Sequence, residues 1–498
     1  MKPSQRVAKN AAWGILSGVV GGGLQFLSVI IVARSLGVSE FGTFNYLLAV
    51  GILFQFLADF GLANILVREI TRRPDELKHL LGSAKGLMWL LFFISVPLLG
   101  VAILVQNIPS VVKAQCFLMG VGSLTSLQGV SYAAVLRAFE DMEFNAIGFT
   151  LHKVALLSFT IVSLKVGFGL WGLVFSNLGA NLLLWFYYAQ VVSWRFGLRV
   201  SLHKDVALWK TMIGEALPLG GGLLLRQIGW QLDSLLLFWL VDPYSVGLFG
   251  GPYRLLLGIR VLSMILIFPL YPGLVRLAKD SPEQFWVFYH RALKLLICLS
   301  LPGTVAFLIT PKIVIKMLLG VKFLGSATAL QCLGFAFVPM FVSALFPYVY
   351  TALGRQRIFL LTIGASVILR VLLELWLIPR FGYISACVIA AACEILPFAM
   401  FIILLGWGRF SLSAADVIIK PIFAGAIMGG VLYLSRRYIG EGSFGTILLM
   451  YFLGGTAYIV ALFCTRPFSK DELSLAKEGL GFLGPYLRSW SQKPEIQP

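Results

Sequence analysis

The sequence predicts an all-α integral membrane protein with about fourteen transmembrane helices. Of its 498 residues, 59% are hydrophobic and only 12% are charged, and the mean hydropathy is +0.89. A soluble domain carries about 25% charged residues. The apolar residues also fall into runs of the length that a helix needs to cross a bilayer, about 20 residues. A soluble protein of several domains is therefore excluded.

Charged or Gly/Pro-rich breaks separate the apolar runs. The first run follows Lys2, Arg6 and Lys9, but at about 23 residues it is too long for a cleavable signal peptide, so we interpret it as a retained helix. The predicted spans are approximately 11–33, 42–66, 80–106, 113–136, 143–165, 169–193, 211–240, 246–274, 289–310, 325–351, 357–379, 382–407, 415–435 and 443–464.

The net charge of +18 is explained by topology. With the N-terminus inside, about 23 of the 40 Lys and Arg residues fall in inside segments and about 9 in outside loops. This ratio predicts a multi-pass protein of the inner (plasma) membrane with both termini cytoplasmic. Clusters such as Arg68/Arg72/Arg73 are then expected to face anionic membrane lipids. Nucleic acid is not a predicted partner.

Motifs for catalysis are missing from the sequence. The six cysteines lie in or beside apolar runs without a C-x-x-C pair, and no two histidines have ligand spacing. No Walker, G-x-S-x-G or H-E-x-x-H signature occurs. The glycines Gly14, Gly18 and Gly22 instead predict a small-residue face for close helix packing. We therefore predict no catalytic residue, no metal site, no cofactor and no enzyme.

Two internal matches indicate a duplicated unit of six spans. The segment SEFGTFNYLLAVGIL resembles SVGLFGGPYRLLLGI when Gly42 is set on Gly247, and FGLWGLVFSNLGAN from Phe168 aligns with FGYISACVIAAACE from Phe381. Because six is even, both copies have the same orientation and are related by a pseudo-twofold axis along the membrane normal. Pro218, followed by three glycines, predicts a bend in span seven.

The expected organisation follows from this repeat. We predict an N-terminal six-helix lobe, a C-terminal six-helix lobe, two additional transmembrane helices (13 and 14) and a cytoplasmic tail. Their bounds are 1–200, 201–410, 411–465 and 466–498.

Several stretches, in the right order, resemble one family. They are ARSLGVSEFGTFNYLLAVGILFQFLADFGL, QLDSLLLFWLVDPYSVGLFGGPYRLL, FPLYPGLVRLAKD and LGRQRIFLLTIGASVILRVLLELWLIPRFGYISA. They are similar to oligosaccharide-lipid flippases of the MOP superfamily, in the polysaccharide-transporter branch that includes the O-antigen-repeat (Wzx-like) flippases. The resemblance implies a fourteen-helix, two-lobe, alternating-access fold. The chain departs from the family at Arg370 and Glu374, where the family often has Asn.

Ionisable residues inside the predicted spans are the candidate site residues, because a buried charge is costly and marks a pathway. The basic ones are predicted to bind a diphosphate through paired hydrogen bonds. They are Lys153, Arg226, Arg254, Arg260 and Arg370. The acidic ones could bind a coupling proton or sodium ion, or serve as charge partners. They are Asp59, Asp233, Glu374 and Glu394.

The resulting hypothesis is a flippase that moves polyprenyl-diphosphate-linked oligosaccharide repeat units from the cytoplasmic to the outer leaflet for cell-surface polysaccharide export. Polar residues predicted to contact sugar are Asn45, Gln55, Gln128, Asn177, Asn181 and Gln231. The polyprenyl tail would lie along spans thirteen and fourteen. A polysaccharide polymerase and a chain-length regulator are candidate partners.

Three alternatives remain open at this point. A cation-coupled multidrug exporter of the same superfamily is disfavoured by the excess of arginines. A membrane polysaccharide polymerase or ligase is disfavoured because no predicted outer loop is large enough for a catalytic domain. The third is a non-transporting scaffold in a polysaccharide assembly complex.

Overall fold

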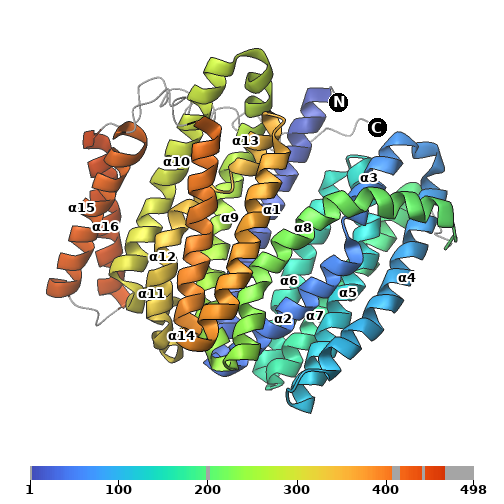
Figure 1. The fold of residues 1–498 in the computed structure, drawn as a ribbon, viewed down its shortest axis with the longest axis horizontal. Helices are drawn as coiled ribbons and strands as arrows, with labels where there is room; N and C mark the ends of the chain where they lie inside the picture. The colour runs from blue at the N-terminus through green and yellow to red at the C-terminus, as the bar shows by residue number, and fades with distance from the viewer. Residues whose placement is uncertain (1–2, 198–201, 407–414, 440–443, 466–498) are drawn as a thin grey trace, which may run out of the picture.

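The computed structural model describes residues 3–197, 202–406, 415–439 and 444–465, and these ranges contain helices and connections without a strand (Figure 1). The N-terminal helices are α1 (Pro3–Ser35), α2 (Val38–Asp59), α3 (Leu62–Arg72), α4 (Leu77–Leu104), α5 (Ser110–Ala138), α6 (Met142–Val166) and α7 (Gly169–Phe196). The later ones are α8 (Val206–Leu240), α9 (Pro243–Asp280), α10 (Pro282–Ile309), α11 (Pro311–Leu318), α12 (Ala327–Val342), α13 (Phe346–Ala352), α14 (Gln356–Gly406), α15 (Lys420–Ile439) and α16 (Phe444–Thr465). Short 3-10 or π turns cover Pro74–Glu76, Val321–Ser326 and Ala415–Ile419.

The helices confirm the predicted all-α membrane architecture. Ten helical segments of the described chain are long and apolar enough to cross a bilayer, and α8, α9 and α12 supply the remaining predicted spans. Helix α14 contains two spans, because Gly382 adopts a non-helical conformation with φ 62° and ψ −147° inside it. Large apolar side chains such as Phe93, Phe186 and Phe452 are exposed around the bundle, as expected for a surface solvated by lipid.

Three local details differ from the sequence-based expectations. Helix α2 ends at Asp59, inside the predicted span 42–66, because Phe60 and Gly61 adopt left-handed backbone conformations that separate α2 from α3; the whole segment Val38–Arg72 is still long and apolar enough to cross a bilayer. The connection between the predicted spans 289–310 and 325–351 contains the helix α11. Of the three glycines proposed as a packing face, only Gly22 has a neighbour within 4 Å of an added Cβ.

The two lobes repeat one packing scheme. In the N-terminal lobe α5 packs on α7, α6 on α7, α2 on α5 and α1 on α6. In the C-terminal lobe α12 packs on α14, α9 on α12 and α8 on α14. These pairs correspond when α1 is matched with α8, α2 with α9 and α5 with α12, as the duplication predicts. Helices α15 and α16 pack on each other, and α15 packs on α10, at the edge farthest from α4–α7 (Figure 1).

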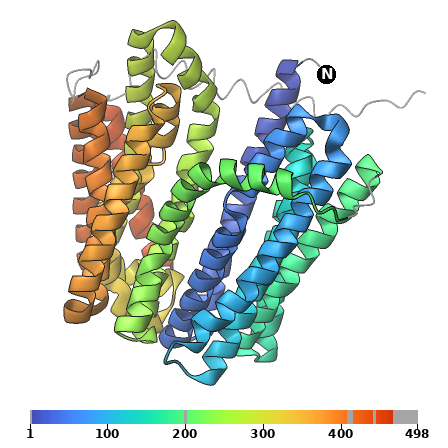
Figure 2. The same cartoon turned by 45° about the vertical axis from the view of Figure 1, so that its right-hand side comes forward.

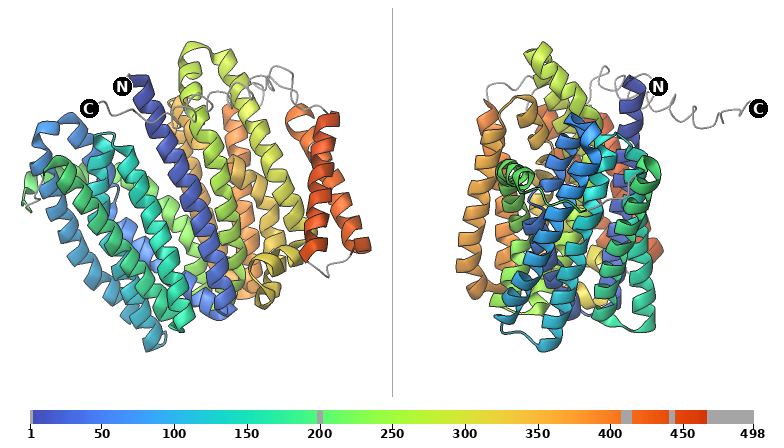
Figure 3. Two further views of the ribbon diagram at one scale, coloured as in Figure 1. Left: turned by 180° about the vertical axis from the view of Figure 1, so that it is seen from behind. Right: turned by 90° about the vertical axis from the view of Figure 1, so that its right-hand side faces the viewer.

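The lobes meet mainly through α1, α2, α8 and α9. Helix α1 lies between the two groups of helices when the molecule is seen from behind (Figure 3). We call the end of the bundle where α1 begins the N-terminal face, and the end where α1 stops the opposite face. Helix α8 first runs across the N-terminal lobe near the N-terminal face and then changes direction to descend through the C-terminal lobe (Figure 2).

A reciprocal contact joins the lobes at the opposite face. A Cβ on Gly42 of α2 would lie 1.8 Å from the carbonyl oxygen of Pro243, and a Cβ on Gly247 of α9 would lie 2.0 Å from that of Val38. Gly42 and Gly247 are the residues aligned by the sequence repeat, and so are Val38 and Pro243. Two equivalent backbones therefore cross at the pseudo-twofold axis, in the pattern of a self-complementary interface.

Candidate functional site

Three of the predicted charges form one buried cluster between α8 and α14. Arg370 donates from Nε to Glu374 Oε1 at 2.8 Å and from Nη2 to Asp233 Oδ2. Arg370 is 5% exposed and both carboxylates are fully buried. The i,i+4 spacing brings Arg370 and Glu374 together on α14, whereas only the packing of α8 on α14 brings Asp233 to them.

This cluster holds more negative than positive charge. Two carboxylates face one guanidinium, and Asp233 Oδ1 and Glu374 Oε2 are buried without a hydrogen-bond partner. A buried charge is stable only when it is paired and hydrogen-bonded. The cluster therefore neutralises Arg370 and leaves one formal negative charge to be balanced.

A second group of side chains ties the lobes together at the opposite face. Arg254 of α9 donates from Nε to Asn45 Oδ1 of α2, and Asn45 is fully buried. The ring of Tyr46 stacks on Phe238 of α8 with centroids 3.8 Å apart. Because each pair has one member in each lobe, these contacts must break if the lobes separate at this face.

Gln106 and Arg34 extend this set of contacts. Gln106, between α4 and α5, accepts from Tyr46 Oη and from Trp239 Nε1, the latter at 3.3 Å. Arg34, in the last turn of α1, donates from Nε to Leu318 O at 3.0 Å and from Nη2 to Met317 O. These carbonyls end α11, so the cation also complements the negative end of that helix dipole.

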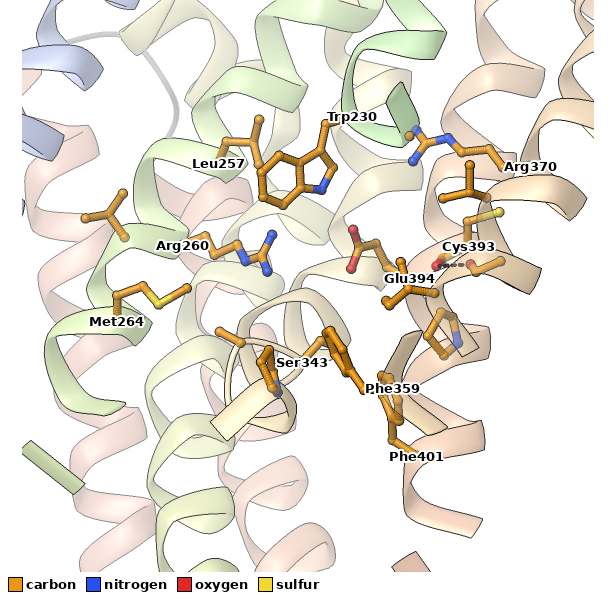
Figure 4. Close-up of a pocket in the computed structure, with 18 residues that line it drawn as sticks. Trp230, Leu257, Arg260, Met264, Ser343, Phe359, Arg370, Cys393, Glu394 and Phe401 are labelled. Atoms are coloured by element: carbon orange, nitrogen blue, oxygen red, sulfur yellow. Dashed lines mark hydrogen bonds between the residues drawn. The ribbon is translucent and has the colours of Figure 1, made fainter. Parts of the chain in front are cut away.

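A cavity of about 290 Å³ lies inside the C-terminal lobe, between α8, α9, α14 and the segment that joins α12 to α13 (Figure 4). Arg260 of α9 and Glu394 of α14 point toward each other across it. The guanidinium carbon of Arg260 lies 5.8 Å from the ring centre of Trp230. Aromatic and aliphatic side chains, including Phe359 and Phe401, complete the walls.

The remaining predicted charges lie apart from one another. Lys153 of α6 donates to Gln25 Oε1 of α1 at 2.9 Å. Asp59 accepts from the Ala63 amide across the break between α2 and α3, at 3.4 Å. The side chain of Arg226, in α8, lies outside the described residues. Among described residues, Lys153, Arg254 and Arg260 have no ion-pair partner within 4.0 Å.

The polar residues predicted to contact sugar differ in burial and in hydrogen bonding. Asn181 donates to Gly122 O at 3.1 Å and to Asn177 Oδ1 at 3.2 Å. Gln128 is buried with both side-chain polar atoms unpartnered. Asn45 belongs to the contacts between the lobes, and Gln55 and Gln231 are half-buried.

At the N-terminal face, the start of α8 is fixed to the N-terminal lobe. Asp205 accepts from the Leu208 amide at 3.0 Å and lies 3.1 Å from His79 Nε2. Hydrogen bonds from Leu208 and then His79 hold the pKa of Asp205 below its ordinary value. Trp209 Nε1 donates to Ser83 O at 2.9 Å. The sequence did not predict these contacts, because they depend on how the segment that joins the two lobes packs against α4.

Sequence reasoning also missed Arg34, Tyr46, Gln106 and Trp239 as residues that join the lobes. Only the repeat carried a signal: Gly42 and Gly247 aligned, and a pseudo-twofold axis brings equivalent residues near the axis together. Nothing in the sequence shows that these two equivalent glycines lie on the axis.

Together, the two equivalent lobes, the reciprocal crossing and the buried charges define a duplicated polytopic helical membrane protein. Residues 7–278, more than half of the chain, match the family model described as "Polysaccharide biosynthesis protein". The chain belongs to this family, which confirms the resemblance found in the sequence.

Curated relatives are similar to this chain over about two thirds of their length. Lipopolysaccharide biosynthesis protein WzxC of Escherichia coli (strain K12) is 21% identical over 348 residues, 67% of each chain. An uncharacterized membrane protein in the cps region of Klebsiella pneumoniae is 24% identical over 351 residues, 66% of this chain and 67% of its own.

Solved structures show the same fold. The Lipid II flippase MurJ in an inward closed conformation has a TM-score of 0.72 at 13% identity, covering 92% of this chain and 99% of its own. An inward-facing multidrug resistance MATE family transporter has a TM-score of 0.61 at 13% identity, covering 79% and 96%. At these identities the similarity concerns the fold alone.

Proposed function

We propose that this protein is a flippase that carries a polyprenyl-diphosphate-linked oligosaccharide across the membrane by alternating access. The observation that carries the proposal is the reciprocal crossing of α2 and α9, which holds two equivalent lobes together at one face. A rocking motion about such a crossing can expose a substrate to each side in turn. Family membership and the similarity to WzxC support a lipid-linked saccharide as cargo.

In this proposal the N-terminal face is cytoplasmic and the structure is closed at the outer face. Opening outward requires loss of the Asn45–Arg254 hydrogen bond and the Tyr46–Phe238 stack. Lys153 and Arg254 are our candidates for the diphosphate, because neither is neutralised by a carboxylate. Arg370 is the weaker candidate, since Asp233 and Glu374 occupy its donors. The cluster of Arg370, Asp233 and Glu374 carries one formal negative charge and is the candidate site for a coupling cation.

The driving force has a defined sign. A diphosphate headgroup is anionic, and moving one charge across 100 mV changes its free energy by about 2.3 kcal/mol. An inside-negative potential therefore favours outward transfer. The proposed flippase should run faster when vesicles are energised with this polarity.

The test is translocation in reconstituted vesicles. A lipid-linked oligosaccharide is placed in the inner leaflet, and its appearance outside is measured with a membrane-impermeant glycosidase. We expect transport by the wild type and its loss in Lys153→Gln, Arg254→Gln and Arg226→Gln, with unchanged protein level. Arg380→Gln, on an exposed part of α14, is the matched control.

Other outcomes would identify other functions. Extrusion of cationic dyes without oligosaccharide transfer would indicate a multidrug exporter. Lengthening of the oligosaccharide in the vesicles would indicate a polymerase. Wild-type rates in all three charge-neutral variants would refute the proposed diphosphate site.

A further inference from the structure

The cavity of the C-terminal lobe presents polar atoms that the protein does not satisfy. Arg260 Nε and Ser343 Oγ are both buried and have no hydrogen-bond partner, and both residues line the cavity. Glu394 faces Arg260 from the other wall, yet the two do not come within ion-pair distance, 4.0 Å, in the described chain. Buried polar groups are nearly always hydrogen-bonded in native proteins, so these atoms are available to bond to a polar ligand in the cavity.

The charges of the cavity walls restrict the chemistry of that occupant. Arg260, Arg370 and Glu394 line this space, and Arg370 is already paired with Asp233 and Glu374. The two charges of the walls without an ion-pair partner in the described chain, Arg260 and Glu394, therefore cancel formally. A diphosphate would be attracted by Arg260 but repelled by Glu394, and a cation would meet the reverse arrangement. A neutral group with hydroxyls fits both walls, because a hydroxyl accepts from a guanidinium and donates to a carboxylate.

The size and the apolar walls restrict it further. At about 290 Å³ the cavity is at the lower limit of ligand pockets, which span roughly 300–1,000 Å³. This volume admits one small ring rather than an oligosaccharide or a polyprenyl chain. Trp230, Phe359 and Phe401 offer flat apolar surfaces beside the polar groups, which matches a ring with apolar faces and a hydroxyl-bearing edge.

We propose that this cavity is a binding site for one neutral sugar ring of the cargo headgroup, with hydroxyls bonded to Arg260, Glu394 and Ser343. The inference rests on the proposed function and deepens it by assigning sugar recognition to the C-terminal lobe. It also assigns Arg260 to binding of the sugar rather than of the diphosphate.

The N-terminal lobe does not offer the same site. Asn181 is the residue that the repeat aligns with Glu394, and its amide already donates to Gly122 O and Asn177 Oδ1. In the N-terminal lobe, the neutral and hydrogen-bonded side chain of Asn181 thus stands where the C-terminal lobe has the carboxylate of Glu394. The duplicated lobes have diverged at this position, as expected if only one of them binds the sugar.

The test measures binding without transport. The purified full chain in lipid nanodiscs is titrated with the oligosaccharide released by mild acid from the lipid-linked pool of its host, and separately with inorganic pyrophosphate. Saturation-transfer NMR and ligand-induced shifts in melting temperature report the affinity. We expect the oligosaccharide to bind, Glu394→Leu to weaken its binding at least tenfold, and Ser343→Ala to weaken it about threefold.

The controls separate this site from a folding defect and from the proposed function. Ile395→Leu, at an exposed neighbour of Glu394, should bind like the wild type, and the melting temperature of each variant without ligand shows whether it is folded. Unchanged affinity in both Glu394→Leu and Ser343→Ala, or displacement of the oligosaccharide by pyrophosphate, overturns the sugar site. Glu394-dependent binding in a protein that transports nothing would uphold the site and refute the flippase.

Discussion

Replacing Gly42 by Ala should open the contact between the lobes at the opposite face. The new Cβ would lie 1.8 Å from the Pro243 carbonyl oxygen, whereas ordinary contact begins at 3.4 Å. Both atoms belong to backbones, so no side chain can rotate away. Overpacking of this kind costs about 1–3 kcal/mol, which corresponds to a shift of about 5- to 150-fold in a two-state population. The ratio of closed to open molecules should fall by that factor.

The shift can be measured by the distance between spin labels on the two lobes. In a cysteine-free background, labels at Val111 at the start of α5 and Val321 after α11 are both exposed. Their distance distribution should move to longer values in Gly42→Ala, and Gly247→Ala should do the same because the contact is reciprocal.

The control is Gly23→Ala, since an added Cβ on Gly23 has no neighbour within 4 Å. It should keep the wild-type distances and melting temperature. An unchanged distance distribution in Gly42→Ala, together with unchanged stability, would refute the assignment of this crossing as the closing contact.

Three more perturbations follow from the described contacts. Arg370→Ala leaves two buried carboxylates unpaired and should destabilise the protein by about 3–5 kcal/mol. The control Arg380→Ala, on the exposed part of α14, should not destabilise it. Equal melting temperatures of the two variants would contradict the buried cluster. Arg34→Ala removes both hydrogen bonds to the end of α11. It should destabilise the closed arrangement by about 1 kcal/mol and lengthen the distance between the labels at Val111 and Val321. An unaltered distance would show that these hydrogen bonds do not help to close the lobes. The lowered pKa of Asp205 means that its stabilisation is complete above the ordinary Asp pKa of about 3.9 and is lost as the pH falls through the lowered value. A melting-temperature series on the acid side should show this loss in the wild type and not in Asp205→Asn, and identical acid profiles would exclude a role for the Asp205 charge.

The spans could be predicted because the bilayer requires a simple pattern. Each crossing helix must satisfy its own backbone and present apolar side chains over about 20 residues, and this pattern is local in the chain. The break at Phe60 and Gly61 could not be predicted in the same way, because the apolar run continues through it. Helix α11 was missed because its eight residues are too few for a span.

The candidate charges illustrate the same division. Arg370 and Glu374 are i,i+4 neighbours, a spacing that lets two side chains share a helix face, and they form an ion pair. Asp233 of α8 bonds to Arg370 of α14, a contact between two helices that no spacing along the chain indicates. Arg254 was grouped with Arg260, yet it reaches into the other lobe while Arg260 faces a cavity within its own.

By itself the sequence determined the helical membrane class, the duplicated lobes, the family and the set of costly buried charges. These follow from properties read along one chain segment: apolar length, repeat offset and the cost of an ion in hydrocarbon. Only the tertiary structure decided that Gly42 meets the backbone of the other lobe, that Arg370 is neutralised and that Arg260 and Glu394 share a cavity. Such contacts join helices distant in the sequence, and their partners depend on how helix faces rotate and pack.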